Sequence, residues 1–296
     1  MSKITALSVL IPTYNHVCDS QVGQLLPLLD AAAISYEVIV ADDGSTDSSV
    51  IESNQRIADF PHCQYIRREE NAGRSAIRNF LAQTAQYDYL LFLDSNISII
   101  SPHFIQRYLS CADNKVVIGG INIEDSPSGQ EGHNLRYLYE KAEAPRYSAT
   151  QRQQSPFQHF RTTNFLIRRN IMLAYPFDER FRHYGYEDVM LGKALHRHHV
   201  AITHIDNPVA FQHFESNSAF VAKTEEGLRT LHQFRSDLRG YSRLLTFVGG
   251  IHIPLILKLI RLWHRLFQKA ERRNLCGSRP SLFIFKLYRL GYFLSL

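Results

Sequence analysis

The stretch that decides the fold covers residues 38–47 and reads Val38-Ile39-Val40-Ala41-Asp42-Asp43-Gly44-Ser45-Thr46-Asp47. Its first four residues are apolar and mostly β-branched, which is typical of a strand buried in a parallel sheet. Two adjacent carboxylates, a glycine and small hydroxyl residues follow at once. Because ligands of open α/β sheets bind beyond the carboxyl ends of the strands, this junction predicts a ligand site.

The same acids could instead serve only a turn. An Asx-type turn that caps the next helix, with Ser45 or Asp47 as N-cap, accounts for Asp47. It does not account for Asp42 and Asp43 side by side, since neighbouring carboxylates need a positive or hydrogen-bonding partner. We therefore favour a ligand site in which Asp42 shapes the turn.

Apolar runs alternate with helical patterns on both sides of this stretch. Strands are predicted at residues 7–11, 64–67, 89–93, 115–120, 165–167 and 200–202, and helices at 22–33, 47–58 and 71–85. Short connections between them predict an α/β fold, a mostly parallel doubly wound sheet with flanking helices. Residues 122–160 are polar and tyrosine-rich without a clear period, so we expect a long functional loop with some helix.

Charge divides the chain into two parts. The full sequence carries +5, but residues 241–296 hold ten Lys or Arg and one acid, Glu271. The other 240 residues hold 23 basic and 27 acidic side chains. We expect a domain over residues 1–240 and a basic extension over residues 241–296, and such a segment indicates an anionic partner.

Cysteines and the N-terminus point to a cytoplasmic location. Residues 1–7 lack the long apolar run of a signal peptide, so none is expected. The cysteines are widely spaced and read as reduced thiols that fill apolar space. They are Cys18, Cys63, Cys111 and Cys276.

The basic extension has the composition of a helix that lies on a membrane surface. Residues 244–257 are apolar but number only 14 and contain Pro254, too few to span a bilayer. Over residues 255–272 basic side chains recur every three or four residues on one helical face, beside an apolar one. We expect an amphipathic helix on an anionic membrane surface; the alternative is a helix packed on the domain with a solvated basic face. Nucleic acid is not expected, because no recognition motif accompanies the charge.

Polar groups collect at the ends of several predicted strands. In this order and spacing they resemble the family 2 glycosyltransferases with the GT-A fold, over roughly residues 5–220. The matching pieces are residues 9–15, 38–47, 71–79, 92–96 and 185–188.

The resemblance implies inverting transfer of a sugar from a nucleoside diphosphate sugar to a hydroxyl of a glycan or lipid-linked acceptor. Such enzymes usually use a divalent metal, Mn²⁺ or Mg²⁺, and UDP is the commonest carrier. A lipid-linked acceptor, as in the building of bacterial surface polysaccharide, would suit a peripheral enzyme on the inner face of the cell membrane.

The resemblance also implies a nucleotide site. Asp43 is expected to accept a hydrogen bond from the base, while Thr13 and Tyr14 wall the base and ribose. Arg74 or Arg78 is expected to hold Asp43 or the diphosphate; the alternative for Arg78 is an exposed helix charge. The implied set is Pro12, Thr13, Tyr14, Asn15, Asp43, Gly73, Arg74, Arg78, Asp94 and Ser95.

Asp94-Ser95-Asn96 stands where the family carries an Asp-x-Asp metal motif, with an amide in place of the last acid. An amide oxygen is still a hard ligand but brings no charge, so weaker metal binding is expected. By the resemblance, Asp94, Asn96 and His213 are the implied ligands. A lone histidine is also often structural.

Glu187-Asp188 forms an acid pair at a predicted helix start, where the helix dipole alone would favour acids. The resemblance makes Asp188 the general base and Glu187 its support or an acceptor contact. Thr163 and Asn164 match a segment that lines the donor sugar or acceptor.

Two other functions remain open. A nucleotide-sugar-binding protein with impaired transfer is favoured by Asn96 alone. A nucleotidyltransferase or dinucleotide oxidoreductase is disfavoured, because no glycine-rich phosphate loop follows the first strand.

Overall fold

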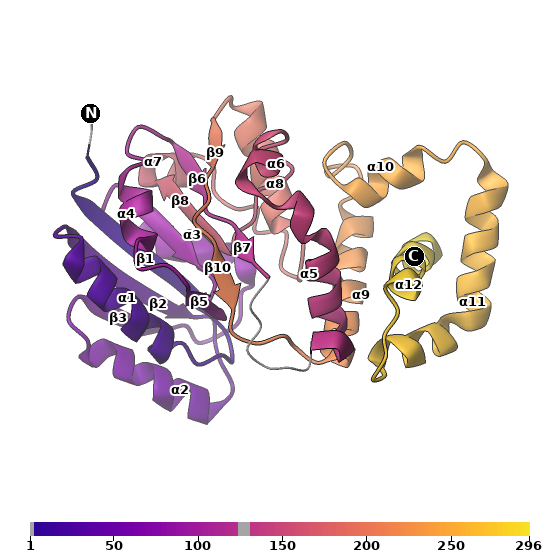
Figure 1. The fold of residues 1–296 in the computed structure, drawn as a ribbon, viewed down its shortest axis with the longest axis horizontal. Helices are drawn as coiled ribbons and strands as arrows, with labels where there is room; N and C mark the ends of the chain where they lie inside the picture. Colours follow the sequence, from indigo (N-terminus) through magenta and orange to yellow (C-terminus); the bar gives the residue numbers. More distant parts are fainter. Residues whose placement is uncertain (1–2, 124–130) are drawn as a thin grey trace.

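The computed structural model describes residues 3–123 and 131–296. A seven-stranded sheet forms its centre, in the order β3-β2-β1-β4-β8-β6-β9 (Figure 1). Strand β8 is antiparallel to both neighbours and the other adjacent pairs are parallel, which confirms the expected mostly parallel sheet. The strands are β1 (Ala6–Thr13), β2 (Ser35–Asp42), β3 (Cys63–Arg67), β4 (Tyr89–Leu93), β6 (Val116–Ile118), β8 (Asn164–Arg168) and β9 (Ile202–His204).

Helices cover both faces of this sheet, so the central strands are buried on both sides. Along β1, Val9 and Ile11 pack in one core with residues of α1, whereas Leu10 packs in a second core with residues of α3. This double burial explains the continuous apolar runs of the central strands. The helices of this part are α1 (Asp19–Ala31), α2 (Ser48–Gln55), α3 (Arg74–Thr84), α4 (Phe104–Leu109), α7 (Arg169–Ala174) and α8 (Glu187–Arg197).

The parallel register gathers the carboxyl ends of three strands at one edge. Thr13 of β1 lies opposite Asp42 of β2, and Leu10 lies opposite Phe92 of β4. The loops that begin at Tyr14, Asp43 and Asp94 therefore start side by side, where open α/β sheets bind their ligands.

A second, three-stranded sheet has no counterpart in the sequence analysis. Its order is β5-β10-β7, with β5 (Ile97–Ile99), β10 (Val209–Phe211) and β7 (Ile121–Asn122). Strands of two or three residues are too short to show a period, which is why the pattern misses them. The strand expected at residues 200–202 begins later, at Ile202, because the amide of Val200 still bonds to Leu195 at the end of α8.

Residues 122–160 are more helical than expected. Within their described part lie α5 (Leu135–Glu143) and α6 (Ala149–Gln153), each started by a side-chain cap from Asn134 or Ser148. Residues 124–130 of this stretch lie outside the described residues. The long α9 (Asn217–Gln233) also went unpredicted, although Phe220, Val221, Leu228 and Leu231 are buried along it at helical spacing.

Three helices form the C-terminal end: α10 (Arg243–Gly249), α11 (Pro254–Cys276) and α12 (Leu282–Ser295). They lie at the end of the long axis away from the N-terminus (Figure 1). Leu275 of α11 and Phe285 of α12 share a core with Leu135 of α5 and Phe220 of α9. The basic extension is thus helical, as expected, and packs directly on the remainder of the chain. Within the described residues, no helix combines the length and apolar character that spanning a bilayer demands.

Candidate active site

The turn after β2 is built by Asp42. Its Oδ1 accepts the Ser45 amide at 2.7 Å and its Oδ2 accepts the Tyr65 hydroxyl. Gly44 has φ +75°, and a Cβ there would lie 2.7 Å from the backbone carbon of Glu70. Only glycine fits such a position without strain, so the turn needs the sequence that it has. Asp42 thus shapes the turn, as the sequence analysis expected.

The side chain of Asp43 points away from this turn and into the cleft. Its Oδ2 accepts the Gly73 amide at 2.9 Å, and its Oδ1 accepts the Ala72 amide at 3.2 Å and Arg68 Nη1 at 3.3 Å. Burial raises the pKa of Asp43, although these donors oppose the shift. The cation that holds Asp43 is thus Arg68, not Arg74 or Arg78, because Arg68 directly follows β3, the neighbour of β2.

Asn15 and Asp47 hold the neighbouring loops together. The Oδ1 of Asn15 accepts hydrogen bonds from the backbone amides of Thr46 and Asp47. The backbone amide of Asn15 donates to Ser45 Oγ at 2.8 Å. Asp47 accepts the Ser49 amide at 3.0 Å and caps α2, as predicted. Asn15 therefore locks the loop after β1 to the loop after β2, beside the cleft.

Two arginines of α3 meet Asp94 beyond the end of β4. Arg78 Nη2 donates to Asp94 Oδ1 at 2.6 Å, and Arg74 Nη2 lies 3.7 Å from Asp94 Oδ2. Burial alone would raise the pKa of Asp94, but the two guanidiniums outweigh it and hold the pKa below its ordinary value. Arg78 is only 1% exposed, so the alternative of an exposed helix charge is wrong for this residue.

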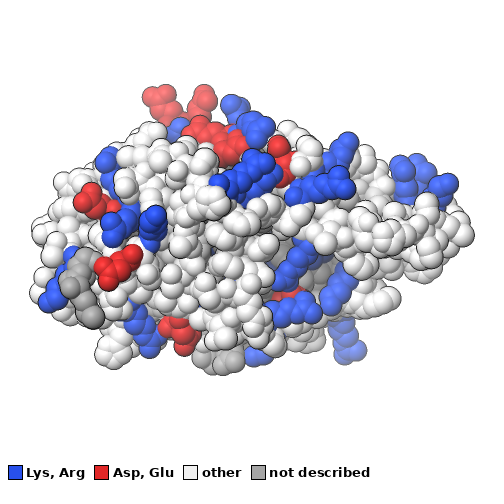
Figure 2. Space-filling model, turned by 90° about the horizontal axis from the view of Figure 1, so that it is seen from above, with Lys and Arg blue, Asp and Glu red and all other residues white. Residues whose placement is uncertain are grey.

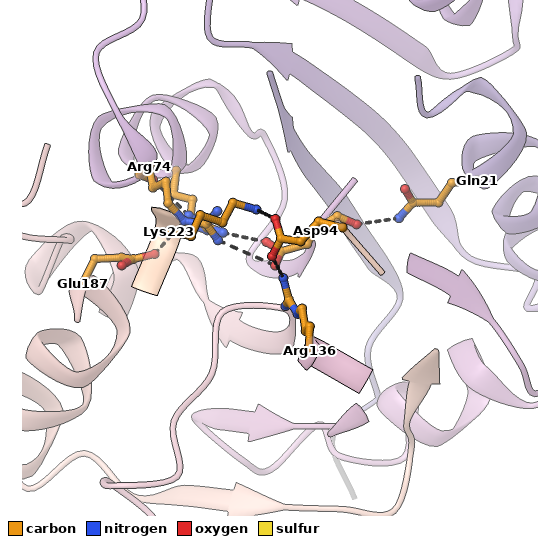
Figure 3. Close-up of polar contacts among 8 residues, drawn as sticks. Gln21, Arg74, Asp94, Arg136, Glu187 and Lys223 are labelled. Atoms are coloured by element: carbon orange, nitrogen blue, oxygen red, sulfur yellow. Dashed lines mark hydrogen bonds and ion pairs between the residues drawn. The ribbon is translucent and has the colours of Figure 1, made fainter. Parts of the chain in front are cut away.

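Arg74 also connects Asp94 to the acid pair of α8. Its Nε donates to Glu187 Oε1 at 2.7 Å, so the guanidinium lies between Glu187 and Asp94 (Figure 3). The loop before α8 places this pair through two left-handed residues, Gly185 (φ +98°) and Tyr186 (φ +70°). A non-glycine residue in that region stores strain, which concentrates at functional sites.

Asp188 lines the cleft next to Glu187. Its Oδ1 accepts the amide of Val189 at 2.7 Å. Burial, and then the neighbouring charge of Glu187, raise the pKa of Asp188 to about 6, against opposing effects of Arg161 and Arg74. A carboxylate that titrates near the working pH is suited to accept a proton.

The candidate metal ligands come from two neighbouring strands. The amide of Gln212 donates to the Asn96 carbonyl at 3.1 Å, which extends the β10–β5 ladder and brings His213 next to this loop. His213 is exposed and does not line the cleft. Within residues 3–123 and 131–296, no group of three or more His, Cys, Asp or Glu side chains could hold a metal.

Thr163 and Asn164 lie at the start of β8, beside Asp94. The Thr163 carbonyl accepts the Asp94 amide at 3.0 Å, and Thr163 lines the cleft. The Asn164 side chain is buried beneath it, where it accepts the Tyr108 hydroxyl at 2.6 Å and donates to two backbone carbonyls. Asn164 therefore holds the floor of the site.

Two cations on helices were missed by sequence reasoning. Arg136 of α5 donates to Glu215 Oε1 at 2.6 Å, and Lys223 of α9 pairs with the other oxygen of Glu215. Both line the cleft, and Figure 3 shows them close to Arg74 and Asp94. Neither residue follows the end of a strand. The helical spacing of their apolar neighbours is the one feature of the sequence that could have placed them on helices.

These groups line one cleft with a volume of about 810 Å³. Figure 2 shows a hollow on this face that is edged by Lys and Arg side chains. All but three of the predicted site residues line the cleft; the exceptions are Asn15, Asn164 and His213. Apart from these three, the residues predicted from the sequence are therefore brought together, although they come from six separate segments.

Comparisons with known proteins agree with this arrangement. The family model "Glycosyl transferase family 2" matches residues 8–175. Validoxylamine A glucosyltransferase of Streptomyces hygroscopicus subsp. jinggangensis is 31% identical over 68% of this chain, and the chondroitin synthase of Escherichia coli is 26% identical over 70%. The chain spans 54% and 34% of the lengths of these two relatives.

A solved structure with a similar fold is the mannosyltransferase of Pyrobaculum calidifontis in complex with GDP-Man and Mn²⁺. It has a TM-score of 0.55 and 12% identity, and the match covers 97% of this chain and 84% of that one. The sheet and its flanking helices are thus those of the GT-A fold. Since the family model matches more than half of the sequence, the protein belongs to the family 2 glycosyltransferases.

Proposed function

We propose that this protein transfers a sugar from a nucleoside diphosphate sugar, UDP-linked, to a hydroxyl of a glycan or lipid-linked acceptor, with inversion. The observation that carries the proposal is the row Asp94–Arg74–Glu187, with Asp188 next to Glu187 in the same cleft. It places the guanidinium of Arg74, which would bind the leaving diphosphate, beside an acid that can take a proton.

The reaction divides the work among three groups. Asp43, held by Arg68 and two backbone amides, presents its carboxylate to the nucleoside base. Asp188 accepts the proton of the acceptor hydroxyl as its oxygen attacks the anomeric carbon. The bond from that carbon to the diphosphate breaks on the opposite face, which inverts the configuration and releases the nucleoside diphosphate.

Positively charged side chains of this protein stabilise the negative charge on the leaving diphosphate. Arg74, Arg78, Arg136 and Lys223 face three carboxylates, those of Asp94, Glu187 and Glu215, which leaves one surplus positive charge. Preorganised cations in a site that excludes water stabilise such developing charge strongly. Arg74 and Arg78 are the candidates to move from Asp94 to the diphosphate when a donor binds.

A divalent ion, Mn²⁺ or Mg²⁺, also fits the chemistry of the donor set. Magnesium is commonly held by one or two carboxylates together with substrate phosphates, so a full protein cage is not required. Asp94 and Asn96, which both line the cleft, would hold it, and it would supply positive charge at the diphosphate; His213, exposed outside the cleft, is not part of this set. Because Asn96 is neutral and Asp94 is already paired with arginine, we expect weak binding. Titration of Mn²⁺ in the presence of UDP, with Asn96→Asp as a variant that should bind more tightly, measures this.

The test of the transfer function uses the full chain and a panel of sugar nucleotides. Released nucleoside diphosphate is measured with and without acceptor, with Mn²⁺ and then with chelator, and the anomeric configuration of the product is read by NMR. Release from one donor, lost in Asp188→Asn, is the expected result. Donor binding without any release would support the binding-only alternative, which the intact Asp188 disfavours.

We further propose that residues 241–296 bind an anionic lipid surface through α11. Only His264, Glu271 and Leu275 of this helix are buried, while a stripe of apolar side chains is exposed, Leu266 by 68% and Leu255 by 62%. Basic residues, Lys258, Arg261, Arg265 and Lys269 among them, flank the stripe. An exposed apolar stripe beside cations is typical of an interfacial helix on anionic lipid.

Vesicle flotation tests the lipid surface. The wild type should float with phosphatidylglycerol vesicles and less with phosphatidylcholine, and the double variant Leu262→Ser/Leu266→Ser should lose flotation. Leu173→Ser is the matched control, since Leu173 is 41% exposed on α7, outside the extension. Unchanged flotation of the double variant contradicts the proposal, as does a wild-type dimer that the double variant abolishes, since the stripe would then bind a second copy.

A further inference from the structure

The cleft is also lined by residues that the proposed nucleotide site does not use. Arg74 contacts Asp94 and Glu187, whereas Arg161 contacts Glu140 of α5 and stacks on Tyr147, and both arginines line the cleft with Asp188. The nucleotide groups belong to the side of Arg74. An acceptor hydroxyl must reach Asp188, so the acceptor occupies the side of Arg161, which we call the far half. It is lined by Tyr139, Glu140, Tyr147, His159, Arg161, Tyr186, Tyr241, Arg243, Phe285 and Arg289.

Three arginines face the far half, and their carboxylate partners are few. Arg161 lies 3.5 Å from Glu140 and its guanidinium stacks over Tyr147 at 4.1 Å. Arg243 lies 3.5 Å from Glu143, an acid that also pairs with Arg146. Two weak ion pairs leave both guanidiniums with donors to spare.

Arg289 of α12 has no ion-pair partner among the carboxylates that the structure describes. Its Nη1 donates to the Tyr139 hydroxyl at 3.3 Å, and its guanidinium lies 5.5 and 5.6 Å from the ring centres of Tyr139 and Phe285. Stacking holds the planar group in one orientation with its other N–H donors free. Keeping a cation unpaired in a partly buried place is costly unless an anion meets it there.

The field in the far half is positive. Burial, and then the charges of Arg243, Arg161 and Arg152, lower the pKa of His159 to about 4, so this histidine is neutral at physiological pH. Glu140 lines the far half and Glu143 pairs with Arg243, so these two acids face three arginines. A neutral sugar needs no such surplus, whereas a phosphate carries the charge and the oxygens that several guanidiniums can share.

We propose that the acceptor carries a phosphate group, which binds in the far half to Arg289 together with Arg243 and Arg161. The inference rests on the proposed transfer function, because it takes Asp188 as the point where the two substrates meet. It also gives α12 a part in the acceptor site, since Arg289 comes from the basic extension. The phosphate can belong to a water-soluble phosphorylated polyol or glycan, or to a lipid.

The test measures binding of glycerol 3-phosphate to the full chain saturated with UDP, so that the nucleotide half is already filled. Glycerol is the neutral control ligand. We expect binding of glycerol 3-phosphate alone, weakened at least tenfold in Arg289→Gln. The control variant is Lys286→Gln, one turn away on α12, exposed and outside the cleft, which should bind like the wild type.

Further binding measurements distinguish the remaining outcomes. Dihexanoyl phosphatidate, used below its micelle concentration, reports the lipid form, and tighter Arg289-dependent binding than that of glycerol 3-phosphate assigns the phosphate to a lipid. Equal affinity of the two assigns it to a soluble acceptor. No binding of either compound, or equal binding by Arg289→Gln and wild type, overturns the proposal. UDP affinity, read in the same experiment, checks the fold of the variant and separates failure of this site from failure of the transfer function.

Discussion

Two pairs of adjacent carboxylates lie at the cleft, and they differ in the number of hydrogen-bond donors around them. Asp42 and Asp43 end β2, where Ser45, Tyr65, Arg68, Ala72 and Gly73 donate hydrogen bonds to them. Glu187 and Asp188 begin α8, where Glu187 accepts a hydrogen bond from Arg74 and Asp188 accepts one from the amide of Val189. The several donors to the first pair suit the recognition role proposed for Asp43, whereas the single backbone donor to Asp188 suits its proposed role as the base.

The difference arises from what each neighbouring loop supplies. The loop before α3 approaches β2 closely enough to aim two backbone amides at Asp43. The loop before α8 instead buries Asp188 beside Glu187, and a like charge together with burial raises the pKa of a carboxylate. An adjacent acid pair in a sequence is therefore compatible with either role, and the partners decide between them.

Removing the reactive acid should give the largest effect. We expect Asp188→Asn to lower kcat by about 10²–10⁴-fold, because a positioned general base contributes that much, with little change in donor affinity. Transfer kinetics and UDP titration measure the two quantities. Asp59→Asn, an exposed acid after α2, is the control and should behave like the wild type. An equal loss of donor affinity in Asp188→Asn would place Asp188 in the nucleotide site instead.

Removing the recognition acid should reverse this pattern. We expect Asp43→Asn to weaken UDP binding by about 1.5–3 kcal/mol, the typical contribution of a hydrogen bond to a charged group. At saturating donor, kcat should stay within a few-fold of the wild type. Calorimetric titration of UDP measures the affinity. If kcat fell and affinity held, the two acid pairs would have the same role and the comparison would fail.

The rigidity of the first pair can be tested through its turn. Gly44→Ala adds a Cβ 2.7 Å from the Glu70 backbone at φ +75°, and we expect a loss of about 1–3 kcal/mol in unfolding free energy. Gly23→Ala is the matched control, because nothing lies within 4 Å of its added Cβ in α1. That variant should be stabilised by about 0.5–1 kcal/mol, the difference between glycine and alanine in a helix. Urea unfolding of both variants measures the difference.

Local patterns in the sequence predicted the first pair well and its partners poorly. The strand, the turn role of Asp42 and the cap at Asp47 depend on neighbours within a few residues, and the structure confirms them. Arg68 as the partner of Asp43 depends on the pairing of β3 with β2, which the sequence does not specify. A surface charge stayed open as the alternative for Arg78, because amphipathic spacing does not tell whether an arginine at the edge of the apolar face is buried.

The side of the cleft formed by helices could not be predicted from the sequence for a related reason. Arg136, Lys223 and Arg289 come from α5, α9 and α12, and no motif marks them, since they reach the cleft only through the packing of those helices. The strands β5 and β10 were equally hidden by their length. Strand-end motifs therefore predicted the side of the cleft formed by the sheet, whereas the side formed by helices needed the structure.

The smallest expected effect is a shift in pH dependence that isolates the second pair. With the pKa of Asp188 raised to about 6, the base is lost by protonation as the pH falls, so kcat should decline below about pH 6. In Glu187→Gln the neighbouring negative charge is gone and Arg74 is no longer neutralised. Both changes favour ionised Asp188, so its pKa falls and the acid limb should move to lower pH. The measured quantity is the pH at the midpoint of the acid limb, which does not depend on any loss in maximal rate. Glu52→Gln, on α2 and outside the cleft, is the control variant. Since Glu187 and Asp188 titrate as a pair, a limb that stays in place or moves to higher pH would assign it to another group.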